Sequence, residues 1–321
     1  MVKIIAKYVA LLAPVLCAII ILQYVGSHEE TDVEALESIV SEEYIIDLSK
    51  EGVLDWGNNK EGSAKFLAGR TGIITFFVGD DATEWTKSDM TTVCDKLNTA
   101  AAYLHECGTK YKQEVDLIYN MSDMMFYEKY EGSISNWEDA NYTKQVYNWI
   151  DKDVNCEYLI SKYDLDGLAF LVVLNGAGVS YAIPHDIEDG KSNYYEVAYI
   201  YLFDSEYPDR YECPAAYAHE LLHLFGAVDL YDYENNPISY PLEAYINMKH
   251  PNEIMYTTYL NGNISLSKNI EQEFSDITAY SVGFLSDSKE IQQYPELKKT
   301  HPACFSEKDG RAITFIDEED N

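Results

Sequence analysis

The stretch from His219 to Asp229 reads HELLHLFGAVD, and it constrains what this chain can fold into more than any other segment. His219 and His223 stand four residues apart, so on a helix they differ by about 40° around the axis and point the same way. Such a pair can hold one Zn²⁺ ion. Glu220 can reach a water at the metal. Gly226 lets the chain leave the helix in a left-handed turn, which brings Asp229 back as a candidate third ligand.

The neighbouring residues agree with a helix over this segment. Pro214 suits the first helical turn, where its missing N–H costs nothing. The residues from Ala215 to Phe225 include no helix breaker, and Gly226 stands where a C-terminal cap belongs. A buried helix whose histidines are merely core residues is the alternative interpretation. The two histidines, the glutamate between them and the Gly/Asp extension together favour the metal site.

The third ligand has competitors. Glu243 follows His223 by 20 positions, near the spacing of HExxH enzymes that use a downstream glutamate. That choice would leave the Gly226 and Asp229 positions unexplained. Asp232 is the nearest other carboxylate, and it could instead cap the turn after Asp229. The spacing therefore favours Asp229, with Glu243 and Asp232 as alternatives.

At these residues the chain resembles the metzincin metallopeptidases, and in particular the bacterial snapalysin-like members, which have Asp as the third ligand. The resemblance implies a zinc cofactor, a peptide or protein substrate, and a methionine-containing turn beneath the metal. The segment Asn252–Tyr256 (NEIMY) is the candidate turn, with Met255 packing under the histidines and contributing shape.

Two further residues follow from the same resemblance. Several metzincin families have a tyrosine two positions after the turn methionine, where this chain has Thr257. Tyr256 follows Met255 directly, so it is a candidate contact to the substrate or transition state rather than a match to the pattern. His250, just before the turn, is a candidate to line the substrate cleft.

Hydrophobic patterns upstream predict a mixed twisted sheet with helices, an α+β fold. The expected elements, in order, are a strand at 72–78, a helix at 88–107 with Ser88 as its N-cap, strands at 115–119 and 168–174 with a helix around 142–161 between them, an edge strand at 179–183, a strand at 195–203 and the zinc helix. This order is similar to that of the metzincin N-terminal subdomain.

The resemblance further implies two subdomains with the zinc helix at the floor of the cleft between them. Residues 67–229 would form the N-terminal catalytic subdomain. Residues 230–321 would form a small irregular C-terminal subdomain with the Met-turn and one final helix around 271–285. An extended substrate would pair with the edge strand at 179–183.

The N-terminal segments predict where the protein is found. Lys3 and Lys7 precede an uncharged stretch at 8–25, so residues 1–27 form either a signal peptide or a retained membrane anchor. The rest of the chain is then extracytoplasmic, secreted or anchored. Residues 28–66 are acidic and weakly patterned, which suits a linker or a pro-segment.

Composition limits the partners. A formal net charge of −32 argues against nucleic-acid binding, and it could attract basic substrates or simply solvate the surface. We expect a monomer that contacts a membrane only through its N-terminal segment. Structural calcium is compatible with the many Asp residues, but no EF-hand-type spacing supports it.

Five cysteines follow residue 27, an odd number, so at least one is unpaired within the chain. Cys94 and Cys107 fall on one predicted helix about 20 Å apart and cannot pair with each other. We expect mostly buried free thiols, with one disulfide left open.

Motif and resemblance together predict a secreted or surface-anchored zinc-dependent endopeptidase with Glu220 as general base. One alternative is a non-catalytic extracytoplasmic binding protein on the same scaffold. The intact Glu220 argues against it, because a binding scaffold needs no general base. Another is a zinc hydrolase of a non-peptide substrate. Replacing Glu220 by alanine separates a hydrolase from a binding protein.

Overall fold

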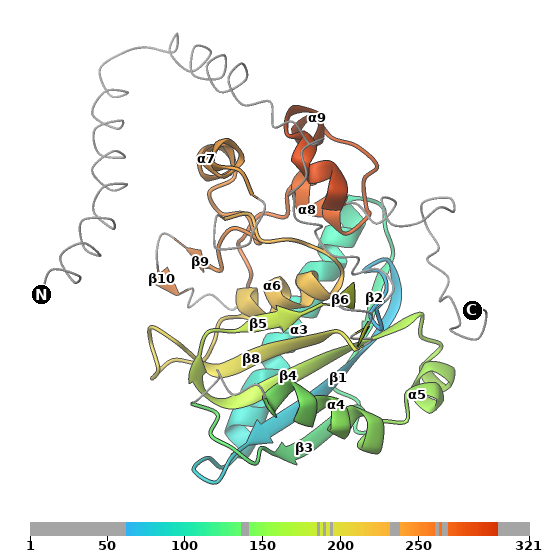
Figure 1. The fold of residues 1–321 in the computed structure, drawn as a ribbon, viewed down its shortest axis with the longest axis vertical. Helices are drawn as coiled ribbons and strands as arrows, with labels where there is room; N and C mark the ends of the chain where they lie inside the picture. The colour runs from blue at the N-terminus through green and yellow to red at the C-terminus, as the bar shows by residue number, and fades with distance from the viewer. Residues whose placement is uncertain are drawn as a thin grey trace, which may run out of the picture. The chain divides into compact units, whose positions relative to one another are not determined.

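The computed structural model describes residues 62–135, 141–184, 187–188, 191–192, 195–231, 238–260, 263–264 and 269–300 (Figure 1). The expected N-terminal targeting segment, most of the acidic segment, Asp232 and Cys304 lie outside these ranges. Among the residues in these ranges, no helix is both long and apolar enough to cross a membrane.

The fold is built around a mixed sheet. Its strand order is β2-β1-β4-β8-β5, and β3 also pairs with β1. Neighbouring strands run parallel except for β5, which runs antiparallel to β8 at the end of that order. The strands are β1 (Gly69–Gly79), β2 (Val115–Ile118), β3 (Met125–Lys129), β4 (Gly167–Gly178), β5 (Tyr181–Ile183) and β8 (Val197–Asp204). The predicted mixed sheet, with an edge strand before the last one, is confirmed.

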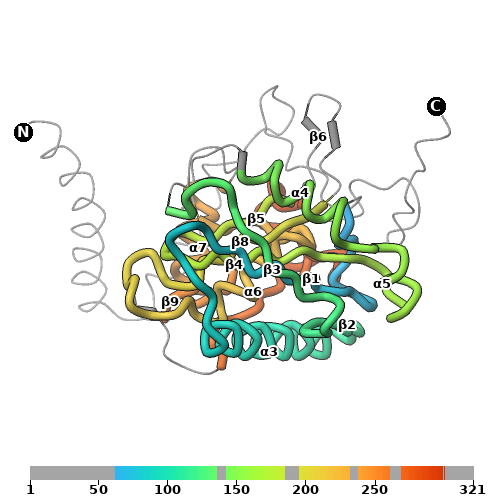
Figure 2. Tube along the Cα trace, turned by 90° about the horizontal axis from the view of Figure 1, so that it is seen from below, coloured from blue at the N-terminus to red at the C-terminus, as the bar shows by residue number. Residues whose placement is uncertain are grey.

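Both faces of the sheet are covered, which explains why its central strands are continuous apolar runs. Along β4, Ala169, Leu171 and Val173 pack in one hydrophobic cluster with α3 (Lys87–Lys110) and α6 (Pro214–Leu224). The alternate residues Phe170 and Val172 pack in a second cluster with α4 (Asn141–Asp153) and α5 (Cys156–Tyr163). Figure 2 shows α3 and α4 on opposite faces of the sheet.

Two helix predictions need correction upstream of α6. The N-cap of α3 is Thr86 rather than Ser88, because Thr86 and Asp89 form a reciprocal capping box that fixes the first turn. The single helix expected around 142–161 is two helices, α4 and α5. The side chain of Asn155 accepts a hydrogen bond from the N–H of Tyr158 and so starts a new helix.

The C-terminal part holds more helix than the one expected. It contains α7 (Tyr240–Lys249), α8 (Asp276–Ser281), α9 (Lys289–Gln293) and a 3₁₀ helix at Pro295–Thr300. Helix α8 is shorter than the predicted 271–285. Glu273 exchanges backbone hydrogen bonds with Asn252 and Ile254 and is therefore extended, and Gly283, at a φ of 80°, lies just past the other end.

The segment that forms α7 lies in the part of the chain expected to be irregular, yet the sequence signals of a helix are present in it. Ser239 caps the N–H of Leu242, a proline stands in the first turn, and Leu242 and Ile246 are buried at helical spacing. Two short hairpins complete the described elements: β6 (Ile187–Glu188) with β7 (Lys191–Ser192), and β9 (Tyr259–Leu260) with β10 (Asn263–Ile264).

The described cysteines Cys94, Cys107, Cys156 and Cys213 are free thiols, and Cys107 and Cys213 are buried as expected. The packed part of the chain also starts earlier than residue 67. Ala64 is fully buried, and its N–H donates to the carboxylate of Glu196 at 2.7 Å. This bond packs the segment around Ala64 against the sheet.

Candidate metal centre

Helix α6 places the two histidines of the HExxH motif. Its N-cap, Cys213, is extended, and Pro214 stands in the first turn without losing a hydrogen bond. Leu221, Leu222 and Leu224 are fully buried, so the helix is apolar nearly all round. It lies between the sheet and the C-terminal helices (Figure 1). This burial fixes its rotation, and with it the direction of the motif side chains.

The chain turns sharply after α6. Gly226 adopts a φ of 91°, a left-handed conformation that glycine accepts most readily, and the N–H of Ala227 donates back to Leu222. The N–H of Leu230 then donates to the carbonyl of Met255 at 2.9 Å. These bonds hold Asp229 under the helix, where the Gly/Asp spacing predicted it.

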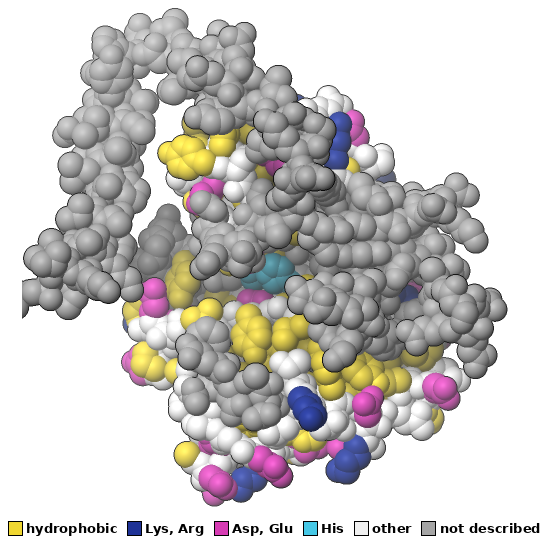
Figure 3. Space-filling model, viewed as in Figure 1, with side chains coloured by type: hydrophobic (Ala, Val, Ile, Leu, Met, Phe, Trp, Pro, Cys, Tyr) yellow, Lys and Arg dark blue, Asp and Glu magenta, His cyan; other side chains and the backbone are white. Residues whose placement is uncertain are grey.

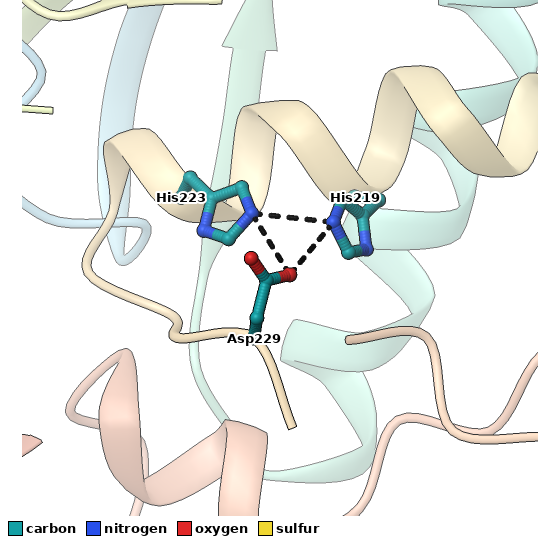
Figure 4. Close-up of side chains that lie close together, drawn as sticks. All are labelled: His219, His223 and Asp229. Atoms are coloured by element: carbon teal, nitrogen blue, oxygen red, sulfur yellow. Dashed lines mark hydrogen bonds and ion pairs between the residues drawn. The ribbon is translucent and has the colours of Figure 1, made fainter. Parts of the chain in front are cut away.

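The three predicted ligand residues converge (Figure 4). The Nε2 atoms of His219 and His223 lie 3.2 Å apart, and Oδ1 of Asp229 lies 3.1 Å from the first and 3.4 Å from the second. Tetrahedral zinc with bonds near 2.1 Å separates its ligand atoms by about 3.4 Å. The donor triangle therefore has the size that a zinc ion requires. Among the described residues, these three form the one group of His, Cys, Asp and Glu with this convergence.

The other ring nitrogens are held by backbone carbonyls. Nδ1 of His219 lies 2.8 Å from the carbonyl oxygen of Ile254, and Nδ1 of His223 lies 2.9 Å from that of Ala227. A carbonyl only accepts, so each Nδ1 carries a proton, and in the neutral ring each Nε2 turns a lone pair toward the centre. Two lone pairs and a carboxylate facing one another repel unless a cation lies between them.

The turn from Glu253 to Tyr256 supports this arrangement from below. Met255 is fully buried, as the Met-turn interpretation requires. Glu253 is also fully buried, and its carboxylate accepts hydrogen bonds from the N–H of Met255 and from Ser275 and Thr278. It thereby joins the turn to α8. Nothing in the local sequence around Glu253 marks this residue as buried.

The charges of His219, His223 and Asp229 depend on one another. Burial alone lowers the pKa of His219, but the hydrogen bond and charge of Asp229, with the charge of Glu220, raise it to about 9. The pKa of His223 is raised by the same carboxylates against its burial. The pKa of Asp229 is held well below its usual range, because the two histidines outweigh its burial. A proton or a metal cation therefore fits between these groups.

Glu220 lies on the same helix but outside the triangle. It is 6% exposed, burial raises its pKa, and its Oε2 makes no hydrogen bond to any described residue. Glu220 and His219 line a cavity of about 260 Å³. Figure 3 shows histidine surface open on this face, with acidic surface beside it.

Of the remaining candidate site residues, Tyr256 lies at the cavity, whereas His250 and Glu243 do not. Tyr256 lines the cavity, and burial raises its pKa. His250 does not line it, and its Nδ1 lies 3.0 Å from the carboxylate of Glu273. Glu243 belongs to the first turn of α7 and is not part of the convergent group. The cavity also contains two carboxylates that sequence analysis missed, Asp204 and Glu212.

Comparisons with known proteins add little. No protein-family model and no curated protein matches the chain. Among solved structures, metalloproteinase-II from Bacteroides fragilis matches with 13% identity and a TM-score of 0.35, over 74% of this chain and 54% of that one. The chain thus spans about half the length of that protein. At this TM-score the likeness does not establish a shared fold or activity.

Proposed function

We propose that this chain is a zinc-dependent metallopeptidase, secreted or anchored at the cell surface, that cleaves peptide bonds within its substrates. The observation that carries the proposal is the triangle of His219, His223 and Asp229 beside a cavity that holds the carboxylate of Glu220. A merely structural histidine pair has no need of a buried glutamate at its side whose Oε2 makes no hydrogen bond to any residue that the structure describes.

The donor set favours zinc over the hard cations. Two imidazole nitrogens and one carboxylate oxygen suit zinc, whereas calcium and magnesium take oxygen ligands. Three protein ligands also leave one position for water or substrate, which is the arrangement of catalytic zinc sites. When bound, zinc supplies Lewis-acid chemistry that polarises a carbonyl and acidifies water.

The protein's own groups supply the rest of the chemistry. Glu220 takes a proton from the attacking water and delivers it to the leaving amine. Its burial raises its pKa, so it holds the transferred proton more readily than an exposed carboxylate would. The carbonyls of Ile254 and Ala227 keep the two histidines in the tautomer that presents Nε2 to the metal.

The substrate would lie along strand β5. This strand ends the sheet order, so an extended peptide can add to it by main-chain hydrogen bonds. The segment Gly178–Ser180, which leads into β5, lines the same cavity as Glu220. A peptide paired with β5 would therefore pass next to the metal centre.

The test compares the wild-type protein with Glu220→Gln. Each protein is assayed for metal content by elemental analysis and for cleavage of a mixed peptide library. Glu106→Gln, the same chemical change at an exposed position of α3, is the matched control. We expect one equivalent of zinc in all three proteins, cleavage by the wild type and the control, and loss of at least about 10²-fold in rate for Glu220→Gln.

The outcomes separate the alternatives. Zinc without cleavage of any peptide would favour a binding protein or a hydrolase of another substrate. A folded protein that takes up no zinc would refute the metal centre itself. Equal cleavage by wild type and Glu220→Gln would refute the role of the glutamate.

A further inference from the structure

The cavity beside Glu220 carries more negative charge than hydrolysis requires. Asp204, at the end of β8, is 2% exposed, and Glu212, just before α6, is 7% exposed. Both line the cavity, and neither belongs to the metal-binding triangle. Glu212 precedes α6 and Glu220 lies within it, so the cavity carries acidic groups outside the metal-binding triangle.

Asp204 accepts hydrogen bonds from neutral donors. Its Oδ1 accepts hydrogen bonds from the N–H groups of Glu206 and Tyr207, each at 2.8 Å. Its Oδ2 accepts one from the hydroxyl of Tyr259, also at 2.8 Å. None of these three donors carries a charge. Within the described ranges, Asp204 forms no ion pair.

Glu212 is less well satisfied. Its Oε1 accepts a hydrogen bond from the N–H of Cys213 at 2.7 Å, and the side chain of Cys213 also interacts with its carboxylate. Burial raises its pKa to about 7, and the charges of Asp204 and Glu220 add to that, against hydrogen bonds from Cys213. Half-buried Lys96 of α3 interacts with it through space without forming an ion pair. Glu212 is thus a buried carboxylate on the cavity wall, and its hydrogen bonds to described residues come from Cys213 alone.

We propose that this cavity binds a positively charged group of the substrate through Asp204 and Glu212. The group is the ammonium or guanidinium of a Lys or Arg side chain beside the scissile bond, or the substrate's own terminal ammonium. This subsite rests on the proposed function, since it gives the metallopeptidase its substrate class.

An organic cation fits the cavity better than a second metal ion. The carboxylates of Asp204, Glu212 and Glu220 do not bring three ligand atoms within 4.8 Å of one another. A long side chain can contact separated carboxylates in turn, as a metal ion cannot. Tyr256 and Tyr259 also line the cavity, and aromatic rings favour the stem and charge of Lys or Arg.

The field of helix α6 opposes such a cation only weakly. The cavity reaches the N-terminal end of α6, where the helix carries the equivalent of about half a positive charge. Two carboxylates outweigh that charge. The net charge of −32 on the whole chain acts in the same direction and attracts cationic substrates from a distance.

The test uses the zinc-loaded full chain and two peptide series. In the first, both peptide ends are blocked, and arginine beside the scissile bond is exchanged for citrulline, which has the same shape without the charge. In the second, all side chains are neutral, and the N-terminus is either free or acetylated. Both series are run on the wild type, on Glu212→Gln and on the control Glu106→Gln. Glutamine can still accept the hydrogen bond of Cys213.

We expect the wild type and the control to prefer the charged member of one series by about 10- to 100-fold in kcat/KM, and Glu212→Gln to lose about tenfold or more of that preference. A preference in the first series assigns the cavity to a basic side chain. A preference confined to the second assigns it to the terminal amine. Cleavage of both series without any preference would overturn the subsite.

Failure of the proposed function gives a different result. If the wild type cleaves no peptide, the dissociation constants of the arginine and citrulline peptides are measured on the same three proteins. Binding of the arginine peptide about tenfold tighter, lost in Glu212→Gln, would still support the cation subsite without hydrolysis. Equal affinities would refute it.

Discussion

Replacing Glu212 by glutamine should stabilise the folded protein, and increasingly so as the pH rises. Glu212 is buried beside two other carboxylates, and its folded-state pKa is about 7 against an ordinary value of 4.5. Folding therefore favours its protonated form. The free energy of unfolding of the wild type is therefore unaffected by this group below about pH 4.5, and it falls as the pH rises from there through 7. Glutamine is neutral at every pH, so the variant does not lose it.

The size of the effect follows from the shift. A change from 4.5 to about 7, at about 1.4 kcal/mol per unit, amounts to roughly 3 kcal/mol well above pH 7. By the same relation the difference between variant and wild type is about 1 kcal/mol at pH 5 and about 2 kcal/mol at pH 6. Other groups that titrate in this range are present in both proteins and largely cancel in the difference.

Urea denaturation at a series of pH values from 5 to 8 measures this difference directly. The two proteins are compared at equal zinc concentration, with Glu106→Gln as the control for the chemical change alone. The control should follow the wild type at every pH. A variant whose stability relative to wild type does not change between pH 5 and 7 would refute the charged, buried state of Glu212, whatever its average stability.

The metal centre gives three more predictions. Glu253→Ala removes the acceptor that joins the turn to α8. We expect the free energy of unfolding, measured by urea denaturation, to fall by about 2–4 kcal/mol, and the zinc affinity, measured by chelator competition, to fall by about 10- to 100-fold. An unchanged zinc affinity would contradict the positioning role of Glu253. Gly226→Ala forces a side chain into a left-handed φ of 91°, so it should lower the free energy of unfolding by about 1–2 kcal/mol and, by moving Asp229, weaken zinc binding. Thermal unfolding with and without zinc measures both effects. Melting temperatures equal to those of the wild type would argue against the strain. Since the metal-free pKa of His219 is about 9, zinc must displace its proton, and apparent affinity should fall about tenfold per unit between pH 8 and 6. A flat dependence would exclude that displacement.

The positions of the three converging side chains could be read from the sequence because they depend on local geometry. Helical spacing fixes His219 against His223, and a glycine in a left-handed conformation fixes the short path to Asp229. The atoms that orient the histidines could not be read in the same way. They are main-chain carbonyls of Ile254 and Ala227, and every residue carries a carbonyl.

The same distinction holds for the fold. Continuous apolar segments such as Leu168–Leu174 indicate buried parallel strands, because burial on both faces of a sheet requires a continuous apolar sequence. The short strand β3 gave no such signal, since most of its residues are half-buried or exposed and it depends on pairing with β1. Helix α7 could have been recognised from Ser239 and the proline that follows. The start of the predicted helix at 271–285 could not, because it depends on a long-range contact between Glu273 and Asn252.

The acidic cavity belongs to the features that sequence patterns do not reveal. Asp204 ends a strand and Glu212 precedes a helix, and acidic residues at such places are usually solvated turns or caps. Their burial arises only when β8, α6 and the segment after Met255 come together around one space. A carboxylate that raises the energy of the folded state by roughly 3 kcal/mol at neutral pH is an unfavourable choice for structure alone. Such a cost is expected where a ligand supplies the missing charge. The higher stability of Glu212→Gln and the preference of the wild type for charged substrates should therefore both be observed or both be absent.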